Sequence, residues 1–138
     1  MSDAPARRSL EQRRAQAAWE TVQKVDQNEG KEFKSVATSL PADIQANGFG
    51  QTMAFLRAKG KGEHEIAFNA VAEWVKQRLN IPDKDFMTWL MTRATTEQYR
   101  QATAEAIAIA IWMKRFAEAR FKSYRGAACR AITRFPSL

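Results

Sequence analysis

The chain has little of what metal sites and catalytic centres are built from. It contains one cysteine, Cys129, and one histidine, His64, among 138 residues. This excludes an internal disulfide, a zinc finger, a two-histidine metal site and a cysteine–histidine nucleophilic pair. Its acidic residues are scattered, with no paired acid and base. We therefore expect no enzyme, no metal and no cofactor, and we expect Cys129 to be an inert thiol.

Long apolar runs are also missing. The longest, from Ala106 to Met113, has eight residues, whereas a membrane span needs about 20. The first residues, MSDAPARRSLEQRR, lack the apolar stretch of a secretory signal. The sequence thus predicts a cytoplasmic protein with no membrane partner.

Glycine and proline are few, and strand patterns are absent. The chain has six glycines and four prolines, and apolar residues recur at helical spacing throughout. The sequence predicts an all-α, single-domain bundle of about six helices over residues 9–125. A flexible tail is expected at residues 1–8, and a basic C-terminal tail at residues 126–138.

Local signals place the ends of these helices. Ser9 with Gln12, and Thr95 with Gln98, fit the capping-box pattern at the starts of the first and last helices. Gly48 fits a left-handed C-cap. The expected elements are a first helix that stops at residues 28–30, a helix over 31–47 with a kink or restart at Pro41, helices over 51–59 and 63–79, a short helix capped by Asp83 or Asp85 that reaches Met91, and a last helix through Arg125.

Positive charge is in excess and unevenly spread. The chain has 22 Lys and Arg against 15 Asp and Glu, a formal net charge of +7. Residues 114–134 hold seven basic residues and one acidic residue, Glu118. If the last helix reaches Arg125, a basic stripe of Lys114, Arg115, Lys122 and Arg125 lies on one face. We expect this stripe to contact phosphates; the alternative is a solvated face with Glu118 ion pairs.

A second basic group, Arg57, Lys59 and Lys61, lies in a stretch with no acidic residue between Asp43 and Glu63. The group straddles Gly60, the glycine at which the helix over 51–59 is expected to end.

Three apolar or mixed features point to contacts with other subunits. Phe49 stands between two glycines, where a short loop would hide it poorly, and we assign it to a subunit interface. Arg120 falls on the apolar side of the last helix, which suits a subunit contact or a buried pair. Residues 106–111 are apolar on all sides, so this helix is either the centre of the bundle or covered by another chain.

The Gly48-Phe49-Gly50 sequence is interpreted as a turn between helices, with phosphate binding by its amides as the alternative.

Residues 40–56, LPADIQANGFGQTMAFL, resemble the LPxxIxxNGLGQxxAFL signature of the small, all-helical subunit of type III-B CRISPR Cmr effector complexes. Residues 10–20 are similar to that family's opening helix, Glu73-Trp74-Val75 to its middle helix, and residues 99–121 to its closing helix. Phe49 stands where leucine is common, and the tail after Phe121 has no match.

The resemblance implies a non-catalytic subunit in antiviral defence. Several copies would stack into a helical filament beside other Cmr subunits and line the groove for guide RNA and target RNA. In that role the basic residues of both groups would neutralise RNA phosphates without reading bases: Arg57, Lys59, Lys61, Lys114, Arg115, Lys122 and Arg125. Gln51, which belongs to the family motif, would contact the RNA backbone or hold a turn. The alternative is a free-standing helical nucleic-acid-binding protein, which the +7 charge would equally permit.

Overall fold

The computed structural model describes residues 8–122, and this part of the chain is almost entirely helical. The all-α bundle that the sequence predicts is confirmed, with no strand between residues 8 and 122. The elements are α1 (Leu10–Lys24), the 3-10 turn η2 (Gln27–Glu29), α2 (Gly30–Asn47), α3 (Phe49–Lys59), α4 (Gly62–Leu79), α5 (Phe86–Thr88), the π-helical turn η3 (Trp89–Arg93) and α6 (Thr96–Arg120).

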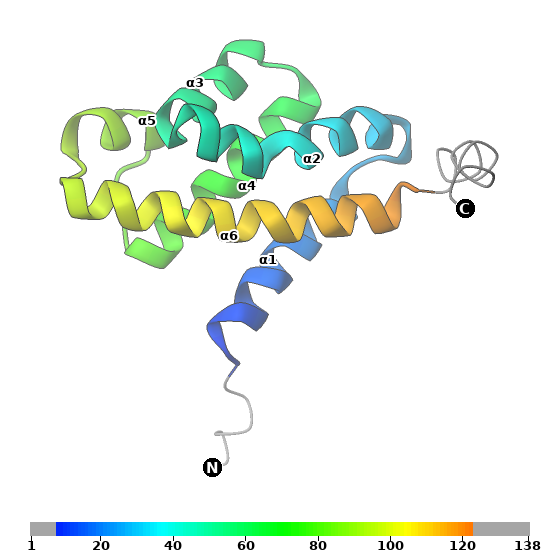
Figure 1. Ribbon diagram of the computed structural model, residues 1–138, viewed down its shortest axis with the longest axis horizontal. Helices are drawn as coiled ribbons and strands as arrows, with labels where there is room; N and C mark the ends of the chain where they lie inside the picture. Colours follow the sequence, from blue (N-terminus) through cyan, green and yellow to red (C-terminus); the bar gives the residue numbers. More distant parts are fainter. Residues whose placement is uncertain (1–7, 123–138) are drawn as a thin grey trace.

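Helix α6 organises the bundle. It runs along the length of the molecule, and α1, α2 and α4 all pack against it (Figure 1). Helix α3 lies on α2 and α4, with its first turn against Tyr99 of α6, and α4 then leads to α5 at one end of the molecule (Figure 1). No helix within residues 8–122 combines the length and the apolar character that crossing a bilayer requires.

Both predicted capping boxes are confirmed. The Gln12 amide donates to Ser9 Oγ at 3.1 Å, and the Ser9 amide donates to Gln12 Oε1 at 2.9 Å. The corresponding bonds between Thr95 and Gln98 are 3.1 and 2.9 Å long. Each box satisfies two backbone donors that a helix start leaves without a partner.

Two predicted helix ends are wrong, and of the two alternatives expected at Pro41 the restart does not occur. Helix α1 ends at Lys24, because Val25 is extended, and Gly30 opens α2 instead of closing α1. Helix α2 continues through Pro41 without a restart. Helix α6 ends at Arg120, and Phe121 leaves helical geometry, so residue 122 lies beyond the helix.

Gly48 separates α2 from α3 as expected, although not in the expected conformation. Its φ of 92° lies in the range that glycine adopts freely, but its ψ of 155° is extended, not left-handed helical. The chain can therefore resume helical hydrogen bonding at once, and α3 begins at Phe49, two residues before the predicted start.

The buried side chains form a large cluster and a smaller one. The large cluster joins α2, α3, α4 and α6 and includes Phe49, which is fully buried. The smaller cluster lies where the end of α1, the start of α2 and the end of α6 meet; it comprises Val22, Val25, Phe33, Ala37, Ala117 and Phe121.

A buried carboxylate, that of Glu105, links three helices. Glu105 of α6 is one of the two buried polar residues in the described chain. Its carboxylate accepts from Arg14 Nη2 of α1 at 2.8 Å and from Trp74 Nε1 of α4 at 2.9 Å, and Arg78 Nε lies 3.4 Å away. Burial alone would raise the pKa of Glu105, but the hydrogen bonds and positive charges of these partners outweigh it and hold the pKa below the ordinary value.

Gly30→Ala should destabilise the fold. Gly30 already has helical dihedral angles, but an added Cβ would lie 2.6 Å from Cε1 of the Phe121 ring in the smaller cluster. We expect the unfolding free energy to fall by about 1–3 kcal/mol, as for other overpacked sites. Gly62→Ala is the control, because its Cβ would meet nothing nearer than the Glu29 carboxylate at 3.4 Å. Urea denaturation of both variants checks this, and a Gly30→Ala protein as stable as the wild type would contradict it.

Glu105→Gln should change the pH dependence of stability. The pKa of Glu105 is lower in the folded state than in the unfolded state. Its ionised carboxylate therefore stabilises the fold fully above the unfolded pKa of about 4.3, and this stabilisation is lost as the pH falls through the folded pKa. We expect Glu105→Gln to lower the unfolding free energy by about 2 kcal/mol at pH 7. Between pH 7 and pH 3, the unfolding free energy of this variant should fall less than that of the wild type.

Thermal unfolding between pH 7 and pH 3 provides the measurement. The exposed Glu73, which faces Lys76 at 3.8 Å, supplies the control Glu73→Gln, with an expected change below about 0.5 kcal/mol. Parallel pH curves for the wild type and Glu105→Gln would rule out this role.

Candidate nucleic-acid interface

The junction of α3 and α4 carries the clearest basic surface. Arg57 and Lys59 lie in the last turn of α3, Gly60 turns the chain with a φ of 60°, and Lys61 caps α4. All three cationic side chains are exposed. Arg57 stacks on the Phe68 ring with 4.3 Å between its Cζ and the ring centroid, so the basic end of α3 is held against α4.

The three cations differ in how far they are neutralised. The carboxylate of Asp85 partly neutralises Arg57. The pKa of Asp85 is lowered mainly by hydrogen bonds from the Thr88 hydroxyl and backbone amide, and to a smaller extent by the positive charge of Arg57. Lys59 and Lys61 form no ion pair with any residue between 8 and 122. The uncompensated charge of this surface therefore comes from the two lysines.

Gln51 lies on the same helix and is exposed. Gln51 and Lys59 are separated by eight residues, just over two helical turns, which places them on one side of α3. Of the residues assigned to RNA from the sequence, the structure brings Arg57, Lys59 and Lys61 together at the α3–α4 junction and places Gln51 in the first turn of α3.

The C-terminal basic stripe is not formed as expected. Because α6 ends at Arg120, Lys122 is not on the helix, and Arg125 and Cys129 lie outside the described residues. Lys114 is half-buried, and Arg115 pairs with Glu118 at 3.3 Å. Glu118 thus forms an ion pair with Arg115 of the same helix, as in the alternative of a solvated face.

The prediction that Phe49 is exposed is wrong. Phe49 is the first residue of α3, and its ring points into the core between Phe86 and Tyr99, with ring centroids 5.9 and 6.4 Å away. It has no exposed surface for a subunit contact in this fold. The Gly50 amide donates to the Tyr99 hydroxyl at 2.8 Å, so it is not free for a phosphate. Of the three residues interpreted as a turn, only Gly48 lies between the helices, because Phe49 and Gly50 belong to α3.

Arg120 has a partner within its own chain. Its Nη1 donates to the carbonyl oxygens of Val22 at 2.7 Å and Val25 at 2.6 Å. These carbonyls lie at the C-terminal end of α1, where helix acceptors lack intrahelical donors. Arg120 therefore caps α1 from α6, and no acidic partner is involved in these bonds.

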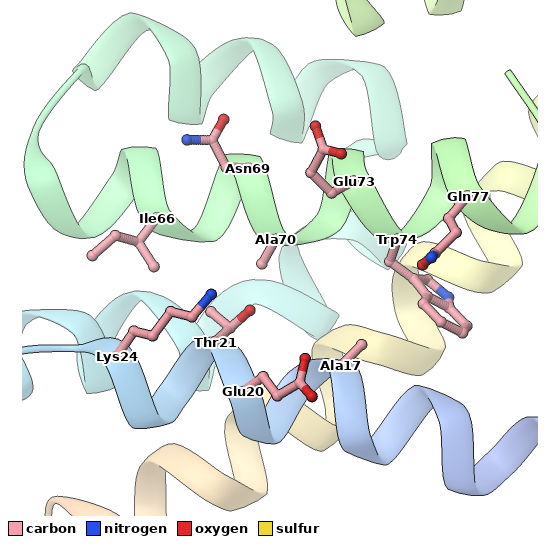
Figure 2. A pocket seen from close by; sticks show the side chains of 10 residues that line it. All are labelled: Ala17, Glu20, Thr21, Lys24, Ile66, Asn69, Ala70, Glu73, Trp74 and Gln77. Carbon is pink, nitrogen blue, oxygen red and sulfur yellow. The ribbon is translucent and has the colours of Figure 1, made fainter. Parts of the chain in front are cut away.

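A groove of about 450 Å³ lies between α1 and α4. Figure 2 shows Glu20 and Lys24 of α1 on one side, Glu73 of α4 on the other, and the small side chains of Ala17 and Ala70 on the facing sides of the two helices. Two carboxylates against one ammonium make this groove unsuited to a polyanion. Within residues 8–122, no three His, Cys, Asp or Glu side chains gather in a way that could hold a metal ion.

The sequence did not single out Phe55. Its side chain is 51% exposed on α3, and Lys59 Nζ lies 5.5 Å from its ring centroid. The available signal was helical spacing: Met53 and Leu56, three residues apart, share one face of the helix, and Phe55 falls on another. The structure buries Met53 and Leu56 and exposes Phe55.

The fold and this surface define a class: a small all-helical protein with a basic edge and no recognisable catalytic cluster in its described part. The family model of the CRISPR-associated protein Cas_Cmr5 matches residues 10–120, and the chain belongs to this family. It is 34% identical over 106 residues to the CRISPR system Cmr subunit Cmr5 of Thermus thermophilus, covering 76% of this chain and 90% of the relative. It is also similar to the crystal structure of a CRISPR-associated Cmr5 family protein from Thermus thermophilus, with a TM-score of 0.61, 30% identity, and coverage of 82% of this chain and 97% of that one.

Arg120→Gln should act on stability and not on association. Loss of the two bonds to α1 carbonyls and of the Arg120 stacking on Phe121 should lower the unfolding free energy by about 2 kcal/mol. Arg115→Gln, which removes only an exposed pair, should change it by less than about 0.5 kcal/mol. Chemical denaturation and sedimentation velocity test this: normal stability with altered self-association would show that Arg120 is an interface residue instead.

Proposed function

We propose that this chain is the small, non-catalytic subunit of a cytoplasmic type III-B CRISPR Cmr complex, which acts in RNA-guided antiviral defence. In this role it assembles with other Cmr subunits and stacks with further copies of itself into a helical filament. It lines the groove that holds guide RNA and target RNA. Its membership of the Cas_Cmr5 family and its similarity to a Cmr subunit support this proposal.

The observation that carries the RNA contact is the basic end of α3. Lys59 and Lys61 are exposed and have no acidic partner within residues 8–122. Arg57 lies in the last turn of α3 with Lys59, and Gln51 lies two helical turns earlier on the same helix. Lysine ammonium groups contact phosphates without distinguishing bases. Sequence recognition is therefore left to base pairing with the guide, as in other RNA-guided complexes. Lys114, Arg115, Lys122 and Arg125 contribute further phosphate contacts in this proposal.

An apolar region on another part of the molecule suits a neighbouring subunit. Ile111 of α6 is 44% exposed, although Ala106, Ile109 and Ala110 beside it are buried. A shallow groove of about 790 Å³ between η3 and α6 includes Met91 and Ile107. Residues 106–111 were expected to lie at the centre of the bundle or under another chain. The central position of α6 explains the buried side of this segment, and in this proposal another chain covers the exposed side around Ile111.

Reversal of two charges should weaken target RNA binding in the assembled complex. We expect Lys59→Glu/Lys61→Glu to leave assembly of the complex intact and to lower its affinity for target RNA. Each lost contact to a single-stranded phosphate makes the slope of log affinity against log salt shallower by about 0.7, so the loss of two contacts per copy changes it by about 1.4. The matched control is Arg13→Glu/Lys24→Glu on α1, where both residues are exposed and the change in net charge is the same.

The complex for this measurement is purified through the tagged chain from its native cells at moderate salt. The proposal expects several proteins of distinct sizes and short RNAs that share a repeat-derived end. A chain that comes down alone or with mixed DNA would instead be a free-standing nucleic-acid-binding protein. Equal effects of the two double variants would show that only overall charge matters.

A further inference from the structure

The solvent face of α3 has an unusual composition. Gln51, Phe55 and Lys59 follow one another at intervals of four residues, and all three are exposed. Ala54 and Ala58, also exposed, lie between them. Residues four apart are neighbours on a helix surface, and alanine does not reach far enough to cover an adjacent ring. The face is therefore a narrow strip with one aromatic ring at its centre.

Phe55 is outside the hydrophobic core. It belongs to neither buried cluster, and 51% of its side chain is exposed. The edge-on His64 ring, 5.9 Å away and inclined by 72°, and Lys59 Nζ, 5.5 Å from the centroid, are its ring contacts in the described chain. The His64 ring packs T-shaped against the Phe55 ring, while Lys59, whose Nζ lies over the ring, is a long, exposed side chain that can move away from it.

Exposed positive charge lies beside the ring, and two carboxylates, those of Glu63 and Glu29, lie at the start of α4. No acidic residue occurs between Asp43 and Glu63. Lys59 and Lys61 are exposed next to the ring's own turn, and Glu63 Oε2 faces His64 Nδ1 at 3.5 Å. A half-exposed aromatic ring beside unneutralised lysines is the arrangement by which proteins bind single-stranded nucleic acids: the ring stacks on a base and the cations hold the phosphates.

We propose that Phe55 is a stacking platform for an unpaired base of single-stranded RNA. Lys59 and Lys61 hold the phosphates on either side of that nucleotide, and the Gln51 amide faces the next one along α3. The inference rests on the proposed function, since it requires RNA at this surface, and it adds contact with a base to contact with phosphates. The stacking is tolerant of sequence, because every base has a flat aromatic face.

The test uses the full chain and two fluorescent probes at low salt. One probe is a 12-nucleotide oligouridine, and the other is an abasic sugar–phosphate strand of equal length. The variants are Phe55→Leu, which keeps an apolar side chain but cannot stack, and Phe55→Trp, which can. Trp19→Leu is the matched control, because Trp19 is a 42% exposed aromatic residue on α1.

Phe55→Leu should weaken oligouridine binding about 5-fold or more, in line with the effect of losing one stacked base, and should leave the salt slope unchanged. Phe55→Trp should retain the affinity, and its fluorescence should be quenched by the bases. Both variants should bind the abasic strand as the wild type does, and Trp19→Leu should behave as the wild type on both probes. Unchanged thermal unfolding confirms that the variants are folded.

Three outcomes would overturn the inference, and they are distinguishable. If Phe55→Leu binds oligouridine normally while Lys59→Glu/Lys61→Glu does not, the surface contacts phosphates only, and the proposed function stands. If Phe55→Leu loses self-association in sedimentation but keeps RNA affinity, the ring contacts protein. If the wild type binds neither probe, stacking and the RNA contact of the proposed function both fail.

Discussion

The buried carboxylate of Glu105 is the constraint on which the arrangement of the helices depends. A charge removed from water is tolerated only with opposite charges and hydrogen bonds around it. Here Arg14 comes from α1 and Trp74 and Arg78 come from α4, so each partner fixes the rotation of its own helix against α6. Apolar packing alone would permit small rotations of these helices, because apolar contacts have no direction. The carboxylate makes one arrangement the favoured one.

The position of the basic surface follows from this arrangement. Helix α4, oriented by Trp74, also presents Phe68, on which Arg57 of α3 stacks. The turn at Gly60 then holds Lys61 at the start of α4 beside Lys59 at the end of α3. A basic surface built at the junction of two packed helices is better fixed in space than one on a tail. This suits the role proposed for the chain, which is to hold RNA without reacting with it.

The chain uses its positive charges in two distinct ways. Arg14, Arg78 and Arg120 are directed at Glu105 or at the carbonyls that end α1, so they stabilise the fold. Lys59 and Lys61 have no such partner within residues 8–122. Arginine can donate several hydrogen bonds in a fixed geometry and suits the first use, while the flexible ammonium of lysine suits a mobile polyanion. The net charge of +7 therefore overstates what is available to RNA.

Short-range signals in the sequence determined the helical class, the two capping boxes, the break at Gly48 and the acid-free stretch around Lys59. Each depends on residues within a few turns of one another, so spacing alone reveals it. Only the tertiary structure decided that Phe49 is buried, that Phe55 is exposed and that Arg120 caps α1. Arg120 reaches carbonyls 95 and 98 residues away, and the first turn of α3 is buried by α5 and Tyr99. Such contacts are set by how helices distant in sequence pack together, and no local pattern contains that information.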